Sequence, residues 1–317
     1  MLVADLLGQL LILLRERPSV VISLQLGFRT LQAVIYRMLF PESRLIVWTG
    51  VSDHTEKGLP KWRVTLRKAL LRRADAVSAN GAGARRYLAV LGVPPEKIFS
   101  LPYGTKVHEL LEIQVEREPE AQRRLLFVGQ LIPRKGLEIF LRILSNWLEE
   151  HLGRSCEFWI AGNGPQRELL EKLSLSSRLH LRFVGSVWSD ELSQIYRQGG
   201  IFAFPTLADE WGVPVNEAMV AGLPVLGSVY AQAVEELVED GVTGWTFRPD
   251  HPGEVYAALS RAMNVSDEQL LEMRHAARRR ARILDAEYGS NCLLAAVDLV
   301  RSASPERLKA QACRGAS

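Results

Sequence analysis

The chain is organised around Asp209-Glu210-Trp211-Gly212-Val213-Pro214-Val215-Asn216-Glu217. The apolar run 201–205 before this stretch predicts a strand. A helix should follow, because Pro214 suits the first helical turn, where a missing N–H costs nothing, and Gly222 is a typical stop. In a parallel α/β sheet, such a strand-turn-helix places unpaired helix amides at the carboxyl edge, where ligands bind. The pattern therefore predicts a phosphate site.

Two carboxylates flank this predicted site. Asp209 lies in the loop before the helix, and Glu217 follows eight positions later, just inside the helix. A carboxylate only accepts hydrogen bonds and can take two hydroxyl donors. A carboxylate on either side of a phosphate suits a sugar at one end and a ribose at the other, so the stretch predicts a nucleotide-sugar site.

The composition is that of an ordinary globular protein. The 317 residues are 47% hydrophobic and 24% charged, with a net charge of +3. This length can bury a large core in two domains, and the charge is too small to argue for a nucleic-acid partner. Cys156, Cys292 and Cys313 have no CxxC-type spacing, which argues against a zinc site or a disulfide framework and favours a reducing cytoplasm.

The apolar residues 2–14 are too few to span a bilayer, and no cleavage site follows them. We expect an amphipathic helix there, no transmembrane segment elsewhere, and a cytoplasmic protein that reaches the inner face of the membrane by peripheral contact. A polar tail follows about Ser302.

Helices and strands alternate along the whole chain. In the first hundred residues we expect helices at 2–17, 28–39, 61–73 and 82–91, and strands at 19–23, 45–48, 75–79 and 98–101. In the second part we expect strands at 125–128, 157–161, 179–184, 201–205, 223–227 and 244–247, and further helices at 136–150, 165–173, 189–198, 231–239, 252–263 and 266–284. The fold class is therefore α/β, with two Rossmann-like doubly wound domains.

The domain boundaries follow from composition. Residues 1–108 form a first domain that looks short, and residues 109–124, rich in Glu, Arg and Gln, form a linker. Residues 125–286 form a complete second domain. Residues 287–317 form a C-terminal helix and tail, with the helix packing back on the first domain.

A second phosphate-type loop joins a strand to a helix at Gly129-Gln130-Leu131-Ile132-Pro133-Arg134-Lys135-Gly136. Glycines with two adjacent cations can hold a diphosphate, Arg134 by its fork and Lys135 as a point charge. The alternative is a solvated loop. A second site at the same edge of the sheet favours phosphate binding.

The turn Ala161-Gly162-Asn163-Gly164-Pro165 resembles part of a dinucleotide fingerprint. Arg167 stands where the third glycine should be, so we reject NAD binding. Gly162 and Gly164 suit the close approach of a nucleotide, or an ordinary tight turn equally well. In the next strand, backbone groups of Val184 and Gly185 could contact a base edge.

His54 follows the predicted strand 45–48 on a carboxyl-edge loop. It could donate hydrogen bonds to a sugar or assist proton transfer. A lone histidine is more often a surface or capping residue, and that alternative stays open.

Helix 61–73 carries apolar and basic residues together, as helices on anionic membranes do. Peripheral membrane contact is one interpretation, and a core-facing helix with a solvated face is the other.

Some chemistries lose their support because their motifs are absent from the sequence. No Asp-x-Asp, Walker A or Gly-x-Ser-x-Gly pattern occurs. Arg134, Lys135 and helix N-termini must then neutralise the diphosphate, so we predict no catalytic metal and no cofactor.

Together these motifs resemble the retaining glycosyltransferases of family 4, which have the GT-B fold of two Rossmann-like domains facing across a cleft. The resemblance covers roughly Val20 to Val300. Its motifs are Phe127-Val128-Gly129 with Lys135-Gly136, Ala161-Gly162-Asn163-Gly164-Pro165, Phe183-Val184-Gly185, and Trp211-Gly212-Val213-Pro214-Val215-Asn216-Glu217-Ala218-Met219-Val220-Ala221-Gly222-Leu223-Pro224-Val225, in family order and spacing.

The resemblance implies roles for individual residues. Lys135 would contact the donor diphosphate, Asp209 and the amides after it would hold the donor sugar, and Glu217 would take the ribose hydroxyls. His54 falls near the position of a donor-contacting histidine. Transfer would proceed with retention, with the departing diphosphate helping to deprotonate the acceptor.

Two sets of site residues follow. The catalytic set is His54, Asp209 and Lys135. The donor-binding set is Gly129, Gln130, Arg134, Lys135, Gly162, Gly164, Val184, Gly185, Asp209, Glu210, Trp211, Gly212, Val213, Pro214 and Glu217.

The sequence departs from the family pattern in three places. Asp209 stands where the family usually has Glu, with Glu210 as a neighbouring substitute. Gln130 replaces the usual Arg of the phosphate loop. The chain also begins after the strand and Gly-rich turn that open the family's first domain, so we expect that domain to be incomplete, truncated at the N-terminus.

We therefore expect a hexosyltransferase that moves a hexose from a UDP- or GDP-sugar to a saccharide or lipid-linked acceptor in surface polysaccharide or glycolipid synthesis. A non-catalytic nucleotide-sugar-binding remnant is one alternative. A nucleotide-sugar epimerase of the same fold is another.

Overall fold

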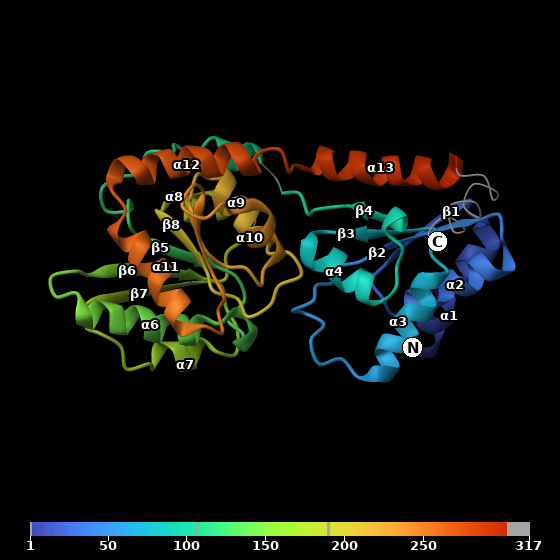
Figure 1. The fold of residues 1–317 in the computed structure, drawn as a ribbon, viewed down its shortest axis with the longest axis horizontal. Helices are drawn as coiled ribbons and strands as arrows, with labels where there is room; N and C mark the ends of the chain where they lie inside the picture. Colours follow the sequence, from blue (N-terminus) through green and yellow to red (C-terminus); the bar gives the residue numbers. More distant parts are fainter. Residues whose placement is uncertain (1, 106, 189–190, 303–317) are drawn as a thin grey trace, which may run out of the picture. The chain divides into compact units, whose positions relative to one another are not determined.

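The computed structural model describes residues 2–105, 107–188 and 191–302 (Figure 1). The chain divides into two compact units, one made of residues 1–102 and 287–317 and the other of residues 103–286. We call them unit 1 and unit 2 and describe each by itself.

Unit 1 is built on a parallel four-stranded sheet. Its strands lie in the order β1 (Val20–Leu24), β2 (Arg44–Trp48), β3 (Ala76–Ala79) and β4 (Ile98–Ser100). Its helical elements are α1 (Leu2–Glu16), α2 (Phe28–Leu39), α3 (Lys61–Arg72), α4 (Ala82–Val90), the short η1 (Pro95–Lys97) and α13 (Ala286–Ser302). In the described residues the order runs one way, without the reversal of a doubly wound sheet.

Successive residues of β2 point to opposite faces of this sheet and belong to two separate cores. Leu45 and Val47 pack with residues of α2 to α4, whereas Ile46 packs with Ala296 and Val300 of α13. The C-terminal helix therefore covers one face of the sheet in unit 1.

Unit 2 is built on a parallel six-stranded sheet. Its strands are β5 (Leu125–Val128), β6 (Cys156–Ala161), β7 (Leu179–Gly185), β8 (Ile201–Phe204), β9 (Val225–Ser228) and β10 (Gly244–Phe247). They lie in the order β10-β9-β8-β5-β6-β7. The order reverses between β5 and β8, and such a switch point is where ligands bind in open α/β sheets.

Helices cover both faces of this sheet (Figure 1). The helical elements are α5 (His108–Leu111), η2 (Pro133–Lys135), α6 (Leu137–Glu150), α7 (Arg167–Glu171), α8 (Leu192–Arg197), α9 (Val213–Val220), α10 (Gln232–Leu237), α11 (Pro252–Asn264) and α12 (Asp267–Ala281). Helices α9 and α12 pack together on one face, and α6 and α11 pack together on the other. All four residues of β5 are buried between these layers, as expected for a central parallel strand.

The predicted fold class, α/β with two parallel sheets, is confirmed. The strands lie within two residues of the expected positions, and helix ends differ by up to three. The sequence did not predict α5, η1 or η2. Residues 189–190 of the helix expected at 189–198, and the tail 303–317, lie outside the described residues.

Residues 109–124, expected as a linker, belong to unit 2 and pack closely against the rest of it. Leu110 and Ile113 are buried in its core. The Arg117 guanidinium donates to the carbonyls of Gly199 and Ala221, and burial lowers its pKa to about 9. This segment is therefore fixed to unit 2 by both apolar and polar contacts.

Candidate functional site

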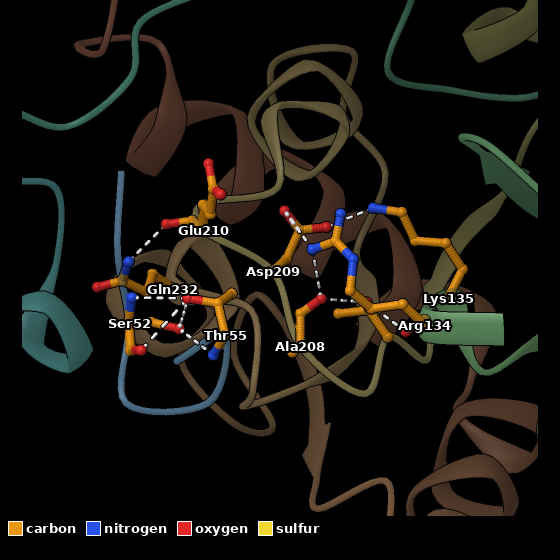
Figure 2. Close-up of polar contacts among 9 residues, drawn as sticks. Ser52, Thr55, Arg134, Lys135, Ala208, Asp209, Glu210 and Gln232 are labelled. Carbon is orange, nitrogen blue, oxygen red and sulfur yellow. Dashed lines mark hydrogen bonds and ion pairs between the residues drawn. The ribbon is translucent and has the colours of Figure 1, made fainter. Parts of the chain in front are cut away.

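The two loops on either side of the switch point meet at a buried ion pair. Lys135, at the end of η2 after β5, pairs its ammonium with Oδ2 of Asp209, in the loop after β8 (Figure 2). Both side chains are nearly nine-tenths buried, at 11% and 12% exposed. The ammonium also lies 5.0 Å from the centre of the Phe204 ring, a cation–π contact.

Arg134 lies beside this pair and is more exposed. Its Nη1 donates to the Ala208 carbonyl at 2.9 Å and lies 4.0 Å from Oδ1 of Asp209. The Arg134 carbonyl in turn accepts from the Thr206 hydroxyl at 3.0 Å and from the Leu207 amide at 2.8 Å. These contacts lock the two loops together, with two cations facing one carboxylate.

Three neighbouring loop backbones are hydrogen-bonded in a row at the same edge of the sheet. The Gly129 amide donates to Ala161 O at 3.0 Å, and the Gly162 amide donates to Gly185 O at 2.7 Å. The structure thus brings Gly129, Gly162 and Gly185 together, with Val184 half-buried beside them.

Packing between loops explains Gly162 and Gly164. A Cβ on Gly162 would lie 1.8 Å from Gly129 O, and one on Gly164 would lie 2.4 Å from Leu131 O. No side chain fits at such distances, and φ of Gly162 is +139°, where L side chains are rare. The sequence left open whether these glycines serve the approach of a nucleotide or a tight turn. The close contacts between the loops are a structural reason for glycine at both positions. Gln130, between these loops, is exposed.

The loop 209–211 is held by the segment that follows β9. The Asp209 amide donates to Tyr230 O at 3.0 Å, and Trp211 O accepts from the Ala233 amide at 2.9 Å. The Gln232 side-chain amide donates to Glu210 O (Figure 2). The Glu210 side chain is exposed and lies apart from the Asp209–Lys135 pair (Figure 2).

Helix α9 begins directly after this loop. Gly212 is its N-cap with φ of +103°, and the Val215 amide bonds back to Gly212 O at 2.8 Å. Pro214 carries no N–H. By position, the amides of Gly212 and Val213 are those that an anion at this helix tip would take.

Glu217 lies further along α9, in a separate environment. Its Oε2 accepts from the Tyr196 hydroxyl at 2.7 Å, and its Oε1 accepts from the Thr105 hydroxyl at 3.4 Å. Burial raises the pKa of Glu217, and the two hydrogen bonds oppose that rise. Burial also raises the pKa of Tyr196 well above its usual value, so its hydroxyl stays a donor.

A cavity of about 270 Å³ opens against Glu217. It is lined by Gly104, Thr105, Glu109, Leu110, Leu192, Ser193 and Glu217. A larger hollow of about 850 Å³, between the start of β10 and α12, includes none of the predicted site residues. The smaller cavity offers two carboxylates and two hydroxyls to a ligand.

His54 lies in unit 1, on the loop after β2, and is described within that unit alone. Its Nε2 lies 3.8 Å from Oδ1 of Asp53, whose Oδ2 accepts from Arg86 at 2.7 Å. The loop is stiffened by hydrogen bonds between Ser52 and Thr55. His54 therefore sits on an ordered loop beside a carboxylate.

The sequence analysis missed two residues that contact the predicted site. Tyr196 and Thr105 both bind Glu217, and nothing in their local patterns indicates it. Tyr196 is fully buried on a six-residue helix, so its polar tip needs a partner, but the sequence does not say which.

Two further features of the described residues bear on other kinds of site. Within residues 2–105, 107–188 and 191–302, three or more His, Cys, Asp or Glu side chains nowhere gather as a metal-binding group. None of the helices described there is long and apolar enough to cross a membrane.

A six-stranded parallel sheet with cations and a helix tip at its switch point is an arrangement found in α/β proteins that bind nucleotides. Residues 110–283, more than half of the chain, match the family model described as glycosyl transferases group 1. The chain belongs to this family, the glycosyltransferases of family 4.

Relatives agree with this assignment. The uncharacterized glycosyltransferase MJ1607 of Methanocaldococcus jannaschii is 29% identical over 54% of this chain and 43% of its own length. The sulfoquinovosyl transferase SQD2 of Arabidopsis thaliana is 33% identical over 42% of this chain and 24% of its own. The chain thus spans less than half of the length of these two relatives.

Solved structures show the same fold. Anabaena Alr3699/HepE, in complex with UDP and glucose, superposes with a TM-score of 0.72 at 16% identity, over 92% of this chain and 83% of that one. The two parallel sheets therefore match the GT-B glycosyltransferase structures.

Proposed function

We propose that this chain acts in a retaining glycosyltransferase that moves a hexose from a UDP- or GDP-sugar to a saccharide or lipid-linked acceptor. Unit 2 would bind the donor and unit 1 the acceptor. The observation that carries the proposal is the buried Lys135–Asp209 pair at the switch point, next to the tip of α9.

The pair suits a donor that carries both phosphate and sugar. Lys135 and Arg134 supply two positive charges, and Asp209 offsets only one of them. A diphosphate would supply the remaining counter-charge, with the amides of Gly212 and Val213 as further donors. Asp209 would keep Oδ2 on Lys135 and offer Oδ1 to a sugar hydroxyl.

Glu217 would take the ribose hydroxyls. Its carboxyl lines the 270 Å³ cavity, and the Tyr196 and Thr105 hydroxyls fix its orientation. A diol that donates to both oxygens favours the ionised form, which burial alone disfavours. Ribose binding would therefore be coupled to ionisation of Glu217.

In the reaction, the site would act mainly on the leaving group. As the bond between sugar and diphosphate breaks, negative charge grows on the diphosphate oxygens, and Lys135, Arg134 and the helix amides stabilise it. The acceptor hydroxyl oxygen then bonds to the sugar carbon while the departing phosphate accepts its proton, with Asp209 orienting the sugar. Lys135, Arg134 and the helix amides would thus neutralise the diphosphate without a metal ion.

The acceptor side would reach the membrane through α3. Trp62 and Leu66 are 63% and 41% exposed on this helix, which also carries Lys61, Arg63 and Lys68. Aromatic and cationic side chains together suit an anionic lipid surface. Such contact would fit a lipid-linked acceptor in glycolipid or surface polysaccharide synthesis.

Mass-detected transfer from a panel of UDP- and GDP-sugars tests the proposal. Transfer to an added acceptor, with retention at the sugar carbon, is the expected result. Nucleotide binding without transfer, in a folded chain, would indicate a non-catalytic remnant instead. Sugar isomerisation without an acceptor would indicate an epimerase.

A further inference from the structure

The side chain of Asn216 joins two segments that are far apart in the sequence. Its Oδ1 accepts from the Trp211 indole N–H at 3.0 Å, and its Nδ2 donates to the Tyr103 carbonyl at 2.8 Å. An indole N–H can only donate and a carbonyl can only accept, so these two contacts fix the orientation of the amide. Asn216 and Trp211 are 0% and 2% exposed.

Tyr103 is followed by residues whose backbone contacts other parts of unit 2. The Thr105 amide donates to Leu284 O at 3.1 Å. A Cβ on Gly104 would lie 2.3 Å from Asp285 O, so the two chain segments are in direct backbone contact. The Tyr103 and Trp211 rings also lie 6.5 Å apart. We call Tyr103 the anchor of this contact, because the residues that follow it are held within unit 2.

Trp211 is the residue between Asp209 and the tip of α9. Its indole is held by Asn216, and its carbonyl is held by the Ala233 amide. The Gly212 and Val213 amides follow it directly in the chain. The Asn216–Trp211 bond therefore holds the stretch of backbone that lies between Asp209 and these amides.

We propose that Asn216 is a positioning residue of the donor site, which ties the loop 209–213 to the Tyr103 anchor and so sets its nucleotide-binding geometry. This inference rests on the proposed function. A buried amide with both ends used is costly to disturb, because each change removes a partner from a buried polar group.

Two variants test the two hydrogen bonds of the Asn216 side chain separately. Asn216→Asp keeps an acceptor for Trp211 but places a carboxylate oxygen against the Tyr103 carbonyl. Trp211→Phe keeps the bond to Tyr103 but removes the indole donor. The matched control is Trp147→Phe in α6, which removes the indole bond of another buried tryptophan, 2.8 Å to the Ser260 hydroxyl, elsewhere in unit 2.

Calorimetric titration with UDP and GDP, together with hydrogen exchange of the peptide 209–217 without nucleotide, tests the inference. We expect Asn216→Asp and Trp211→Phe each to weaken nucleotide binding about tenfold and to speed exchange in this peptide. Trp147→Phe should change neither, although it should lower the Tm similarly.

Wild-type binding and exchange in Asn216→Asp would overturn the inference, whatever Trp211→Phe does. If the wild-type chain binds neither nucleotide, the proposed function fails. The exchange rates would then still show whether Asn216 holds the loop.

Discussion

Replacing Lys135 with methionine removes one partner of the buried ion pair and keeps most of the side-chain volume. Asp209 would then be a carboxylate only 12% exposed, with Arg134 4.0 Å from its Oδ1 as the remaining nearby cation. Removing one partner of a buried pair costs about 3–5 kcal/mol. Because Arg134 still offsets part of the charge, we expect the lower end, about 3 kcal/mol.

A domain of this size shifts its Tm by about 2–4 °C per kcal/mol, so Lys135→Met should lower the Tm by about 6–12 °C. Neutralising both partners, in Lys135→Met with Asp209→Asn, removes the unpaired charge. The double variant should regain most of the lost Tm, because two neutral side chains replace an ion pair at little cost.

Thermal unfolding by circular dichroism gives the stability of both variants, and calorimetry with UDP and GDP gives the binding. The double variant should be stable but bind nucleotide at least about tenfold more weakly, since a charged contact to phosphate is lost. A Tm for Lys135→Met within about 2 °C of the wild type would refute the buried pair. Undiminished nucleotide affinity in the double variant would refute the role of Lys135.

Three further changes test other parts of the account. Burial raises the pKa of Glu217, so the stability that this group contributes is fully present below its unfolded-state pKa of about 4.3 and is lost as pH rises through the folded pKa. Glu217→Gln should not lose it, and Tm curves from pH 4 to 7 that stay parallel would contradict this. Gly162→Ala should destabilise the protein far more than Gly153→Ala. A Cβ at Gly153, with φ of +91°, has nothing within 4 Å, so alanine there costs only the backbone strain of about 1–2 kcal/mol. Equal Tm losses would mean that the loops are not in contact. Replacing Trp62 and Leu66 with serine should reduce flotation with anionic vesicles, whereas equal flotation of the variant and the wild type would exclude α3 as the contact.

Local patterns predicted the strands and the central helix well. The run before Pro205 forms β8, and α9 begins at Val213, one residue before Pro214, and ends two residues before Gly222. These signals are local, since proline, glycine and apolar runs act over a few residues. The four-residue α5 has no such signal, and its place in the core of unit 2 follows from contacts distant in sequence.

The sequence predicted which residues lie at the same edge of the sheet, but not which of them contact one another. Parallel strands bring their carboxyl ends to one edge, so the sequence placed Lys135 and Asp209 in the same region. It could not show that they pair with each other, because their 74-residue separation carries no distance information. Likewise, the sequence does not reveal that the Tyr196 hydroxyl reaches Glu217 or that Gly162 lies against a neighbouring loop.

In the proposed function, unit 2 binds a nucleoside diphosphate between Lys135 and the tip of α9. Calorimetric titration of the wild-type chain with UDP and GDP, each beside its monophosphate, tests it most directly. We expect one diphosphate to bind and its monophosphate to bind at least about tenfold more weakly, since the second phosphate meets Lys135 and the helix amides. Equal affinity for the two, or no binding of either diphosphate by the folded chain, would contradict the account.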